Sequence, residues 1–320
     1  MNAHPARAGR LIIGVDGGGT KTSAVLAELD SDGQPRILAR GHSGPSNMRL
    51  AGQRRALASL VEALAPAREI LAERGGPADI AVLALAGSGY DDVQATIRSW
   101  ADEHCLCRRL EIISDAAPVL AAGTPGRWGV ALVVGTGSVA VGVDRQGRSI
   151  TRGGWGHWYG DKGSGYDLGC RALAAVSEAE DGMGPETALR ERMLAYFGLE
   201  EPRRIIQTLY AGGNVRSQIA SAAPVVLAAA DAGDIVAARI VQDCAGELIR
   251  LVTAVTCDLE FEDAYPLALA GGVICGDAGY QARLEAGLRA INPAPGVVTR
   301  VPEPVLGCLR IGQAHLDTAD

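Results

Sequence analysis

The segment LIIGVDGGGTKTSAVLAELDSDG, from Leu11 to Gly33, predicts the architecture of this chain. It consists of an apolar strand, a turn rich in glycine, a second apolar strand, and an acidic residue with a glycine that reverse the chain. This is the pattern of a β-hairpin. A second segment, VALVVGTGSVAVGVDRQG from Val130 to Gly147, follows the same plan. The repetition predicts two similar lobes, each of which begins with a hairpin.

The segments around the hairpins alternate between strand and helix patterns. After the first hairpin we expect a strand at 37–40, a helix at 49–73 kinked at Pro66, a strand at 79–87, a helix at 91–100 and a strand ending at Ser114 and Asp115. After the second hairpin we expect a strand at 148–152, helices from 166 to 259 with breaks at 184–185, 212–213 and 233, a strand at 265–274, a helix at 280–289, a strand at 296–300 and a helix at 305–315. This order predicts an α/β fold with mixed sheets and a cleft between two lobes.

The linker chemistry of AGTPG near residues 123–126 sets the expected domain boundary. We expect a disordered tail at 1–9, an N-terminal lobe at 10–122 and a C-terminal lobe at 123–320. The last helix is free to pack back on the N-terminal lobe.

Composition excludes several classes of partner. The formal charge of −7 and the lack of a basic run argue against nucleic acid and anionic membranes. Seven scattered cysteines, an odd number without C-x-x-C spacing, indicate a reduced protein. The first nine residues lack the apolar core of a signal peptide, and no apolar run reaches membrane-spanning length. We therefore expect a cytoplasmic protein with a small-molecule substrate.

The two hairpin tips have the chemistry of phosphate cradles. Glycine lets the backbone approach an anion, and bare N–H groups with small hydroxyls then bind its oxygens. Two such tips indicate a nucleoside triphosphate, although each could also be a permissive or tight turn. In DGGGTKT, Asp16 ends a strand where a carboxylate holds Mg²⁺, and Thr20 and Lys21 add a hydroxyl and a cation. The spacing matches neither a Walker loop nor a dinucleotide fingerprint.

Asp115 follows a buried strand and precedes a helix rich in small residues. It is either the N-cap of that helix or a general base at the carboxyl end of the strand. Phosphoryl transfer to an alcohol needs a carboxylate that orients the hydroxyl and accepts its proton.

The densest segment is GGWGHWYGDKGSGYDLG, from Gly153 to Gly169. It is either a packed loop or a binding loop in which Trp faces meet a sugar ring and polar edges meet its hydroxyls. His157 taken alone indicates a hydrogen-bonded structural residue. In LALAGGVICG, Gly271 and Gly272 are either a simple strand-to-helix turn or a place where a base or ribose passes close to bare backbone.

Together, DGGGTKT, SDAA, GTGS, GGWGHWYGDKGSG and AGGV resemble the actin-like, hexokinase-type ATPase superfamily, and within it the BadF/BadG family that contains N-acetylglucosamine kinase. The resemblance implies two actin-like, ribonuclease H-like lobes, ATP and Mg²⁺ as cofactors, and Asp115 as the catalytic residue. The ATP-binding residues that it implies are Gly18, Gly19, Thr20, Lys21, Gly135, Thr136, Gly137, Ser138, Gly271 and Gly272. The sugar-binding residues that it implies are Asn47, Asp115, Thr136, Gly154, Trp155 and Asp161.

The activity implied by the resemblance is ATP-dependent phosphorylation of the 6-hydroxyl of an amino sugar, with N-acetyl-D-glucosamine favoured. Val139 stands where the compared N-acetylglucosamine kinases carry Asn, and Lys162 replaces a common acidic residue. One alternative is a glucosamine kinase of the same family. Another is an ATPase that activates a dehydratase or reductase through a cysteine-bound iron–sulfur cluster, for which only Cys105 and Cys107 offer ligands. A homodimer is left open.

Overall fold

The computed structural model describes residues 9–318, and these form two compact units. The first unit comprises the chain up to Arg127 together with the segment that begins at Glu303. The second unit runs from Trp128 to Pro302. Residues 1–8 of the expected N-terminal tail lie outside the described residues, whereas the Gly9 N–H donates to the Leu29 carbonyl at 2.9 Å.

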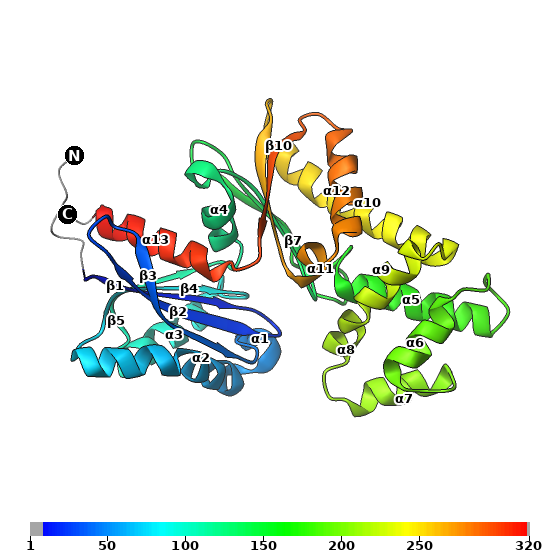
Figure 1. Cartoon of the computed structure of the whole chain (residues 1–320), viewed down its shortest axis with the longest axis horizontal. Coiled ribbons are helices and arrows are strands. Elements are labelled where there is room, and N and C mark those ends of the chain that lie inside the picture. The colour runs from blue at the N-terminus through cyan, green and yellow to red at the C-terminus, as the bar shows by residue number, and fades with distance from the viewer. Residues whose placement is uncertain (1–8, 319–320) are drawn as a thin grey trace. The chain divides into compact units, whose positions relative to one another are not determined.

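The first unit contains a five-stranded mixed sheet (Figure 1). Its strands are β1 (Leu11–Gly17), β2 (Thr22–Leu29), β3 (Pro35–Ser43), β4 (Ala78–Leu85) and β5 (Cys107–Ile113), in the order β3-β2-β1-β4-β5. β2 pairs with β1 and β3 in antiparallel fashion, whereas β4 pairs with β1 and β5 in parallel fashion. The predicted hairpin and mixed sheet are confirmed.

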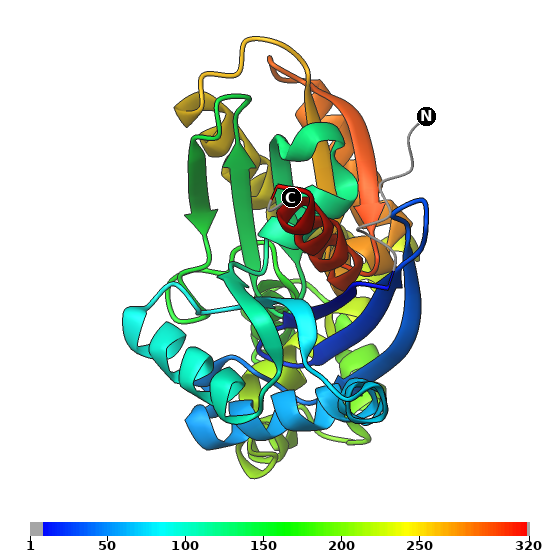
Figure 2. The same cartoon turned by 90° about the vertical axis from the view of Figure 1, so that its left-hand side faces the viewer.

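Helices cover both faces of this sheet. They are α1 (Met48–Ala51), α2 (Gln53–Arg74), α3 (Asp91–Glu103), α4 (Ala117–Gly123) and α13 (Val305–Asp317), with a short 3₁₀ turn η1 (Pro125–Arg127) after α4. On one face, Ile13 of β1 belongs to a hydrophobic core with residues of α2 and α3. On the other face, Ile12 belongs to a core with residues of α4 and α13. Figure 2 shows α2 below the sheet and α13 above it. A strand buried on both faces is apolar throughout, which is why β1 reads as a continuous apolar run.

The expected helix at 49–73 differs from the structure in one respect. The segment is broken at Gly52, where a φ of 80° separates α1 from α2. Glycine adopts this left-handed region without the steric cost that other residues pay. Pro66 lies inside α2, which continues on both sides of it.

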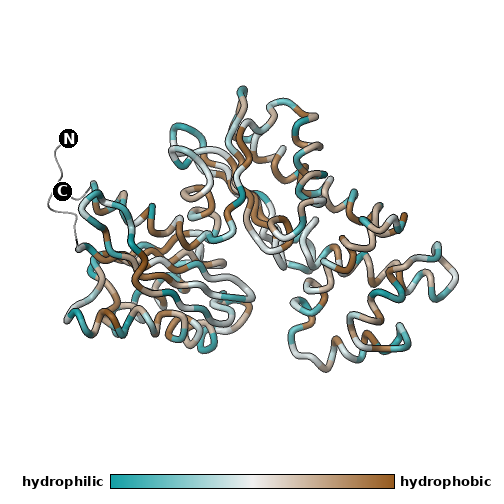
Figure 3. The backbone as a smooth tube through the Cα atoms, viewed as in Figure 1, coloured by the Kyte–Doolittle hydropathy of each residue, from teal (hydrophilic) through white to brown (hydrophobic). Residues whose placement is uncertain are grey.

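The second unit repeats the sheet topology of the first. Its strands are β6 (Gly129–Val134), β7 (Ser138–Val143), β8 (Ser149–Gly153), β9 (Tyr265–Ala270) and β10 (Pro295–Val301), in the order β10-β9-β6-β7-β8. The hairpin β6–β7 and the pair β7–β8 are antiparallel, and β9 pairs in parallel with β6 and β10. The prediction of two similar α/β lobes is confirmed. Apolar residues concentrate along these strands (Figure 3).

The helices of the second unit lie mostly between β8 and β9. They are α5 (Gly165–Glu180), α6 (Leu189–Phe197), α7 (Arg203–Ala211), α8 (Val215–Ser221), α9 (Ala223–Asp231), α10 (Ile235–Asp258), α11 (Gly272–Gly276) and α12 (Ala278–Arg289). The three predicted breaks are confirmed. A further break follows Gly198, whose φ of 68° ends α6. The expected strand at 265–274 ends at Ala270, because Gly271 turns the chain into α11.

The observed units differ from the expected lobes at the boundary between them and at the C-terminal end of the chain. The first unit continues past residue 122 through η1 to Arg127, and it also includes α13, so the second unit does not extend to residue 320. Within residues 9–318 no single helix has the length and apolar character of a membrane span; α8–α9 and α10 would meet the criteria only together, with a bend of 118° between them.

Candidate functional site

The tip of the first hairpin presents unpaired backbone donors. Gly17 pairs with Thr22, and the Gly18 N–H donates to the Lys21 carbonyl at 2.9 Å. The N–H groups of Gly19, Thr20 and Lys21 have no acceptor among the described residues. This is the arrangement that binds an anion, because several N–H dipoles gather at a turn that has no large side chain in the way.

The loop that precedes α1 is held against this tip. The Gly18 carbonyl accepts hydrogen bonds from the N–H groups of Ser46 and Asn47, both at 3.1 Å. A Cβ on Gly17 would lie 2.0 Å from the Ser46 hydroxyl, so only glycine fits there. The loop therefore brings Asn47 beside the glycine tip.

Asn47 also has a local structural role. Its Oδ1 accepts the N–H groups of Arg49 at 3.0 Å and Leu50 at 3.3 Å, which makes Asn47 the N-cap of α1. Gly87, with a φ of 78°, packs against the same side chain: a Cβ there would lie 3.1 Å from Oδ1. The predicted contact of Asn47 with a sugar stays a prediction.

Asp16 and Asp115 lie at the same edge of the first sheet. Asp16 is opposite Ala84 of β4, Ala84 is opposite Ile113 of β5, and Asp115 follows two residues later. Burial raises the pKa of Asp16 to about 6, and the negative charge of Asp115 adds to the effect while the Lys21 ammonium opposes it. Two carboxylates and one ammonium thus converge next to the glycine tip.

The structure places Asp115 directly before the N-cap residue of α4. The residue at the N-cap position of α4 is Ala116, and no side chain caps this helix. Burial raises the pKa of Asp115, and hydrogen bonds from its own N–H and that of Ala116 oppose the rise. A desolvated carboxylate with a raised pKa is suited to accept a proton.

The tip of the second hairpin has the same character as the first. Val134 pairs with Ser138, and the Gly135 N–H donates to the Gly137 carbonyl at 2.9 Å. In the described part of the chain the N–H groups of Thr136 and Gly137, and the Thr136 hydroxyl, have no partner. The Ser138 hydroxyl is committed elsewhere, because it donates to the Lys162 carbonyl at 2.7 Å.

Asp161 supports this second tip from the loop between β8 and α5. It is only 4% exposed and has a φ of 53°. Its Oδ1 accepts the Ser138 N–H at 3.2 Å, and its Oδ2 accepts Arg216 Nη2 at 2.9 Å. Sequence reasoning missed Arg216, because it lies on α8, distant in the chain and outside any motif. The predicted sugar contact of Asp161 stays a prediction.

The same loop exposes aromatic side chains. Trp155, Trp158 and Tyr159 are 70%, 84% and 74% exposed. His157 instead stacks beside Trp158 with 4.9 Å between ring centroids and meets the edge of Tyr166 at 5.2 Å. These exposed rings suit the apolar face of a sugar. Gly154 begins this segment with a φ of 71°, and a Cβ there would lie 3.3 Å from Val139.

Gly271 and Gly272 have different roles in the turn between β9 and α11. Gly271 has a φ of 101°, and a Cβ there would lie 2.4 Å from the Val134 carbonyl oxygen. Position 271 therefore requires glycine because the chain packs closely against β6 there. Nothing lies within 4 Å of a Cβ on Gly272, so that position is open to a ligand.

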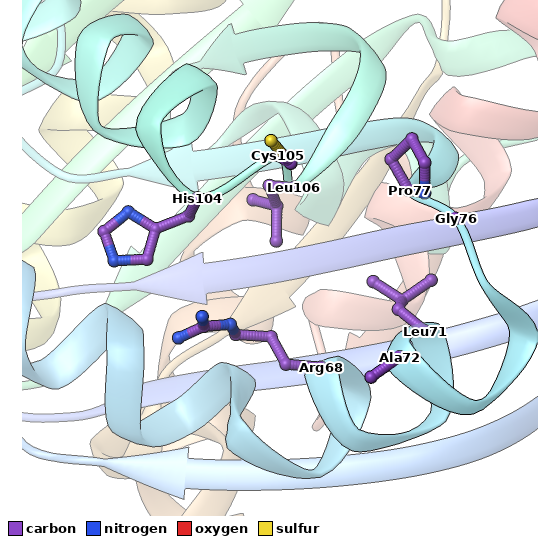
Figure 4. Close-up of a pocket in the computed structure, with 8 residues that line it drawn as sticks. All are labelled: Arg68, Leu71, Ala72, Gly76, Pro77, His104, Cys105 and Leu106. Carbon is purple, nitrogen blue, oxygen red and sulfur yellow. The ribbon is translucent and has the colours of Figure 1, made fainter.

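Among residues 9–318 no cluster of three or more His, Cys, Asp or Glu side chains could hold a metal. A cavity of about 280 Å³ lies at the other edge of the first sheet, near the starts of β4 and β5 (Figure 4). Its lining residues are Arg68, Leu71, Ala72, Gly76, Pro77, His104, Cys105 and Leu106. The lining includes Cys105, one of the two cysteines considered as iron–sulfur ligands, but none of the residues predicted to bind ATP or the sugar.

The two matching sheets with glycine-tipped hairpins are those of an actin-like, hexokinase-type α/β fold. A ROK family glucokinase from Streptomyces griseus, solved in complex with glucose and AMPPNP, has the same fold. The comparison gives a TM-score of 0.57 at 19% identity and covers 96% of this chain and 98% of that chain.

The particular family follows from the sequence match. The pattern of the BadF/BadG/BcrA/BcrD ATPase family matches residues 13–294, and the chain belongs to this family. An N-acetylmuramic acid/N-acetylglucosamine kinase from Clostridium acetobutylicum is 32% identical over 266 residues, which are 83% of this chain and 86% of that protein. An N-acetyl-D-glucosamine kinase from Dictyostelium discoideum is 33% identical over 277 residues, 82% and 85% of the two chains.

Proposed function

We propose that this protein is a sugar kinase that transfers a phosphoryl group from ATP to the 6-hydroxyl of an amino sugar. The observation that carries the proposal is the convergence of Asp16, Asp115 and Lys21 beside a glycine tip with unpaired N–H groups. Phosphoryl transfer needs this combination of an anion cradle, positive charge and a carboxylate for the acceptor. Membership of an ATPase family supports ATP as the donor.

Asp115 is the general base in this proposal. Burial raises its pKa toward the working pH. A base whose pKa lies near the working pH is still partly ionised and accepts a proton effectively. The residues of the two tips, Gly18 to Lys21 and Gly135 to Ser138, bind the phosphates. Gly272 offers bare backbone to the adenosine.

Asp16 fits a role in holding Mg²⁺. Its carboxylate is desolvated, lies near a second carboxylate, and receives no hydrogen bond from the described residues. A divalent cation offsets both the desolvation and the repulsion between the two aspartates. When bound, Mg²⁺ neutralises charge on the phosphates.

N-acetyl-D-glucosamine is the favoured acceptor. Both relatives described above carry N-acetylglucosamine in their names. The exposed rings of Trp155, Trp158 and Tyr159 offer an apolar shelf for an acetamido methyl group, whereas a free amine prefers carboxylates and water. Glucosamine is the main competitor, since the Asp161 carboxylate lies on the same loop, but this carboxylate already pairs with Arg216 at 2.9 Å.

A panel of sugars tests the proposal. The full chain is assayed with ATP and Mg²⁺ against N-acetylglucosamine, glucosamine, N-acetylmuramic acid, glucose and no sugar, with ADP release and sugar phosphate both measured. We expect the highest kcat/KM for N-acetylglucosamine and little ADP release without sugar. A higher kcat/KM for glucosamine would overturn the acceptor alone. ADP release that is equally fast without any sugar would overturn the kinase.

A further inference from the structure

Arg216 packs against the tip of the second hairpin. Its side chain is 18% exposed, and Nη2 lies 2.9 Å from Asp161 Oδ2. A Cβ on Gly137 would lie 2.8 Å from this Nη2 and 2.6 Å from Asp161 Oδ1. The absence of a side chain at Gly137 therefore lets an ion pair approach the backbone that carries the unpaired N–H groups.

Asp161 is held in one place by its surroundings. Its left-handed backbone conformation is uncommon for a residue other than glycine. Two residues later, the Gly163 N–H donates to Asp167 Oδ2 at 2.8 Å, and the Gly163 carbonyl accepts the Tyr280 hydroxyl at 2.7 Å. The backbone is thus fixed at both polar groups of Gly163, two residues after Asp161, which helps to keep the Asp161 carboxylate beside the tip.

A carboxylate at this position needs a partner. Asp161 is buried directly behind donors that are suited to an anion, so its charge alone would repel a phosphate group. Arg216 supplies the compensating positive charge. The pKa of neighbouring His157 is lowered first by burial and then by the charge of Arg216, while Asp161 acts in the opposite direction.

We propose that Arg216 is a positioning residue for the nucleotide phosphates. It neutralises Asp161 and keeps this carboxylate on the Ser138 N–H, so that the tip presents its remaining N–H groups to an anion without a repelling charge behind them. The proposal rests on the proposed function, because it assumes that the second tip binds the phosphates of ATP.

The mechanism predicts opposite effects for the two halves of the ion pair. Arg216→Met leaves a buried carboxylate beside the phosphates, and we expect the affinity for ATP to fall about tenfold or more. Asp161→Asn leaves the positive charge, and we expect the affinity for ATP to stay equal or to rise. Arg216→Lys keeps the charge, so it should lose less than Arg216→Met. A role in folding alone would weaken binding in both single variants.

Binding is measured by calorimetry on the full chain without sugar, with ATP–Mg²⁺ and with adenosine as the ligands. Adenosine has no phosphate, so Arg216→Met should change its affinity less than about twofold, whereas the affinity for ATP falls. Arg203→Met is the matched control, because Arg203 is 83% exposed and pairs with Asp181 away from the tip. An unchanged ATP affinity in Arg216→Met, or equal losses for adenosine and ATP, would overturn the proposal.

The double variant Asp161→Asn with Arg216→Met decides the question even if Arg216→Met does not fold. It contains no unpaired buried charge, and the side-chain oxygen of the introduced asparagine can still accept the Ser138 N–H. We expect ATP affinity within about threefold of that of Asp161→Asn. A tenfold weaker affinity would show that Arg216 binds phosphate directly and contradict the positioning role. If the unmodified protein does not bind ATP, the proposed function fails instead.

Discussion

At the scale of single residues, Asp115 is the most consequential side chain. Asp115→Asn keeps the shape and the hydrogen bonds but removes the base. We expect kcat to fall by about two decades or more, with binding of sugar and ATP retained. Turnover is measured with saturating substrates, and binding by calorimetry. A variant that retains more than about half of its turnover would place the base elsewhere.

Asp16 links the proposed chemistry to the pH dependence of stability. Folding raises its pKa from 3.8 to about 6. Between these values the folded state binds more protons than the unfolded state, so the free energy of unfolding falls as the pH rises through this window. Relative to the ionised form, protonation of Asp16 therefore stabilises the fold fully below pH 3.8 and no longer above about pH 6, where the buried charge is a penalty. The shift corresponds to about 3 kcal/mol.

Asp16→Asn removes this penalty. In Mg²⁺-free buffer we expect the variant to unfold at a higher temperature than the unmodified protein at pH 7.5, with the difference shrinking at pH 4. With ATP and Mg²⁺ present we expect the variant to lose kinase turnover. Thermal unfolding at the two pH values measures this. A variant that is less stable than the unmodified protein at pH 7.5 would show that the buried carboxylate stabilises the fold.

At the scale of elements, the loop from Gly153 to Ser164 depends on helices far away in the chain. Tyr280 of α12 is fully buried, and its hydroxyl donates to the Gly163 carbonyl at 2.7 Å. Tyr280→Phe should lower the free energy of unfolding by about 1–3 kcal/mol, because a buried carbonyl loses its donor. Urea unfolding of the two proteins measures the difference.

Tyr265 provides a matched control for this experiment. It is also buried, at 1% exposed, but its hydroxyl has no hydrogen-bond partner among the described residues. Tyr265→Phe should therefore be neutral or stabilising. Equal losses of stability in Tyr265→Phe and Tyr280→Phe would mean that the hydrogen bond to Gly163 contributes nothing.

At the scale of the whole molecule, the C-terminal helix completes the N-terminal unit. α13 covers one face of the first sheet, where Val305, Cys308 and Leu309 are buried. The helix approaches α4 closely, since a Cβ on Gly307 would lie 1.9 Å from the Pro118 carbonyl oxygen. Arg310 also donates to the carbonyl oxygen of Ala122 at 3.0 Å.

Gly307→Ala tests this packing. Replacement of a helical glycine by alanine normally raises the free energy of unfolding by about 0.5–1 kcal/mol. Here, however, the added methyl group would push α13 away from α4. We expect a net loss of about 1–3 kcal/mol in the free energy of unfolding. The matched control is Gly246→Ala in α10, where nothing lies within 4 Å of the new Cβ and stability should rise. Stabilisation by both substitutions would contradict close packing of α13.

The sequence by itself determined the two hairpins, the mixed sheets and the order of the elements. These features are local: apolar runs, glycine turns and helical spacing report on neighbouring residues in the chain. The same reasoning predicted Asp16, Asp115 and both glycine tips as parts of the candidate site. The sequence did not place the break at Gly52, because one glycine within a helical pattern gives no reliable sign of its φ.

Only the tertiary structure decided which groups act on one another. It paired Asp161 with Arg216, bound Gly163 to Tyr280, placed α13 on the first unit and made Ala116 the N-cap residue of α4. Each of these depends on contacts between segments that are distant in the chain. Local patterns carry no information about such contacts, because the energy of a buried charge or hydrogen bond depends on which partner the fold brings to it.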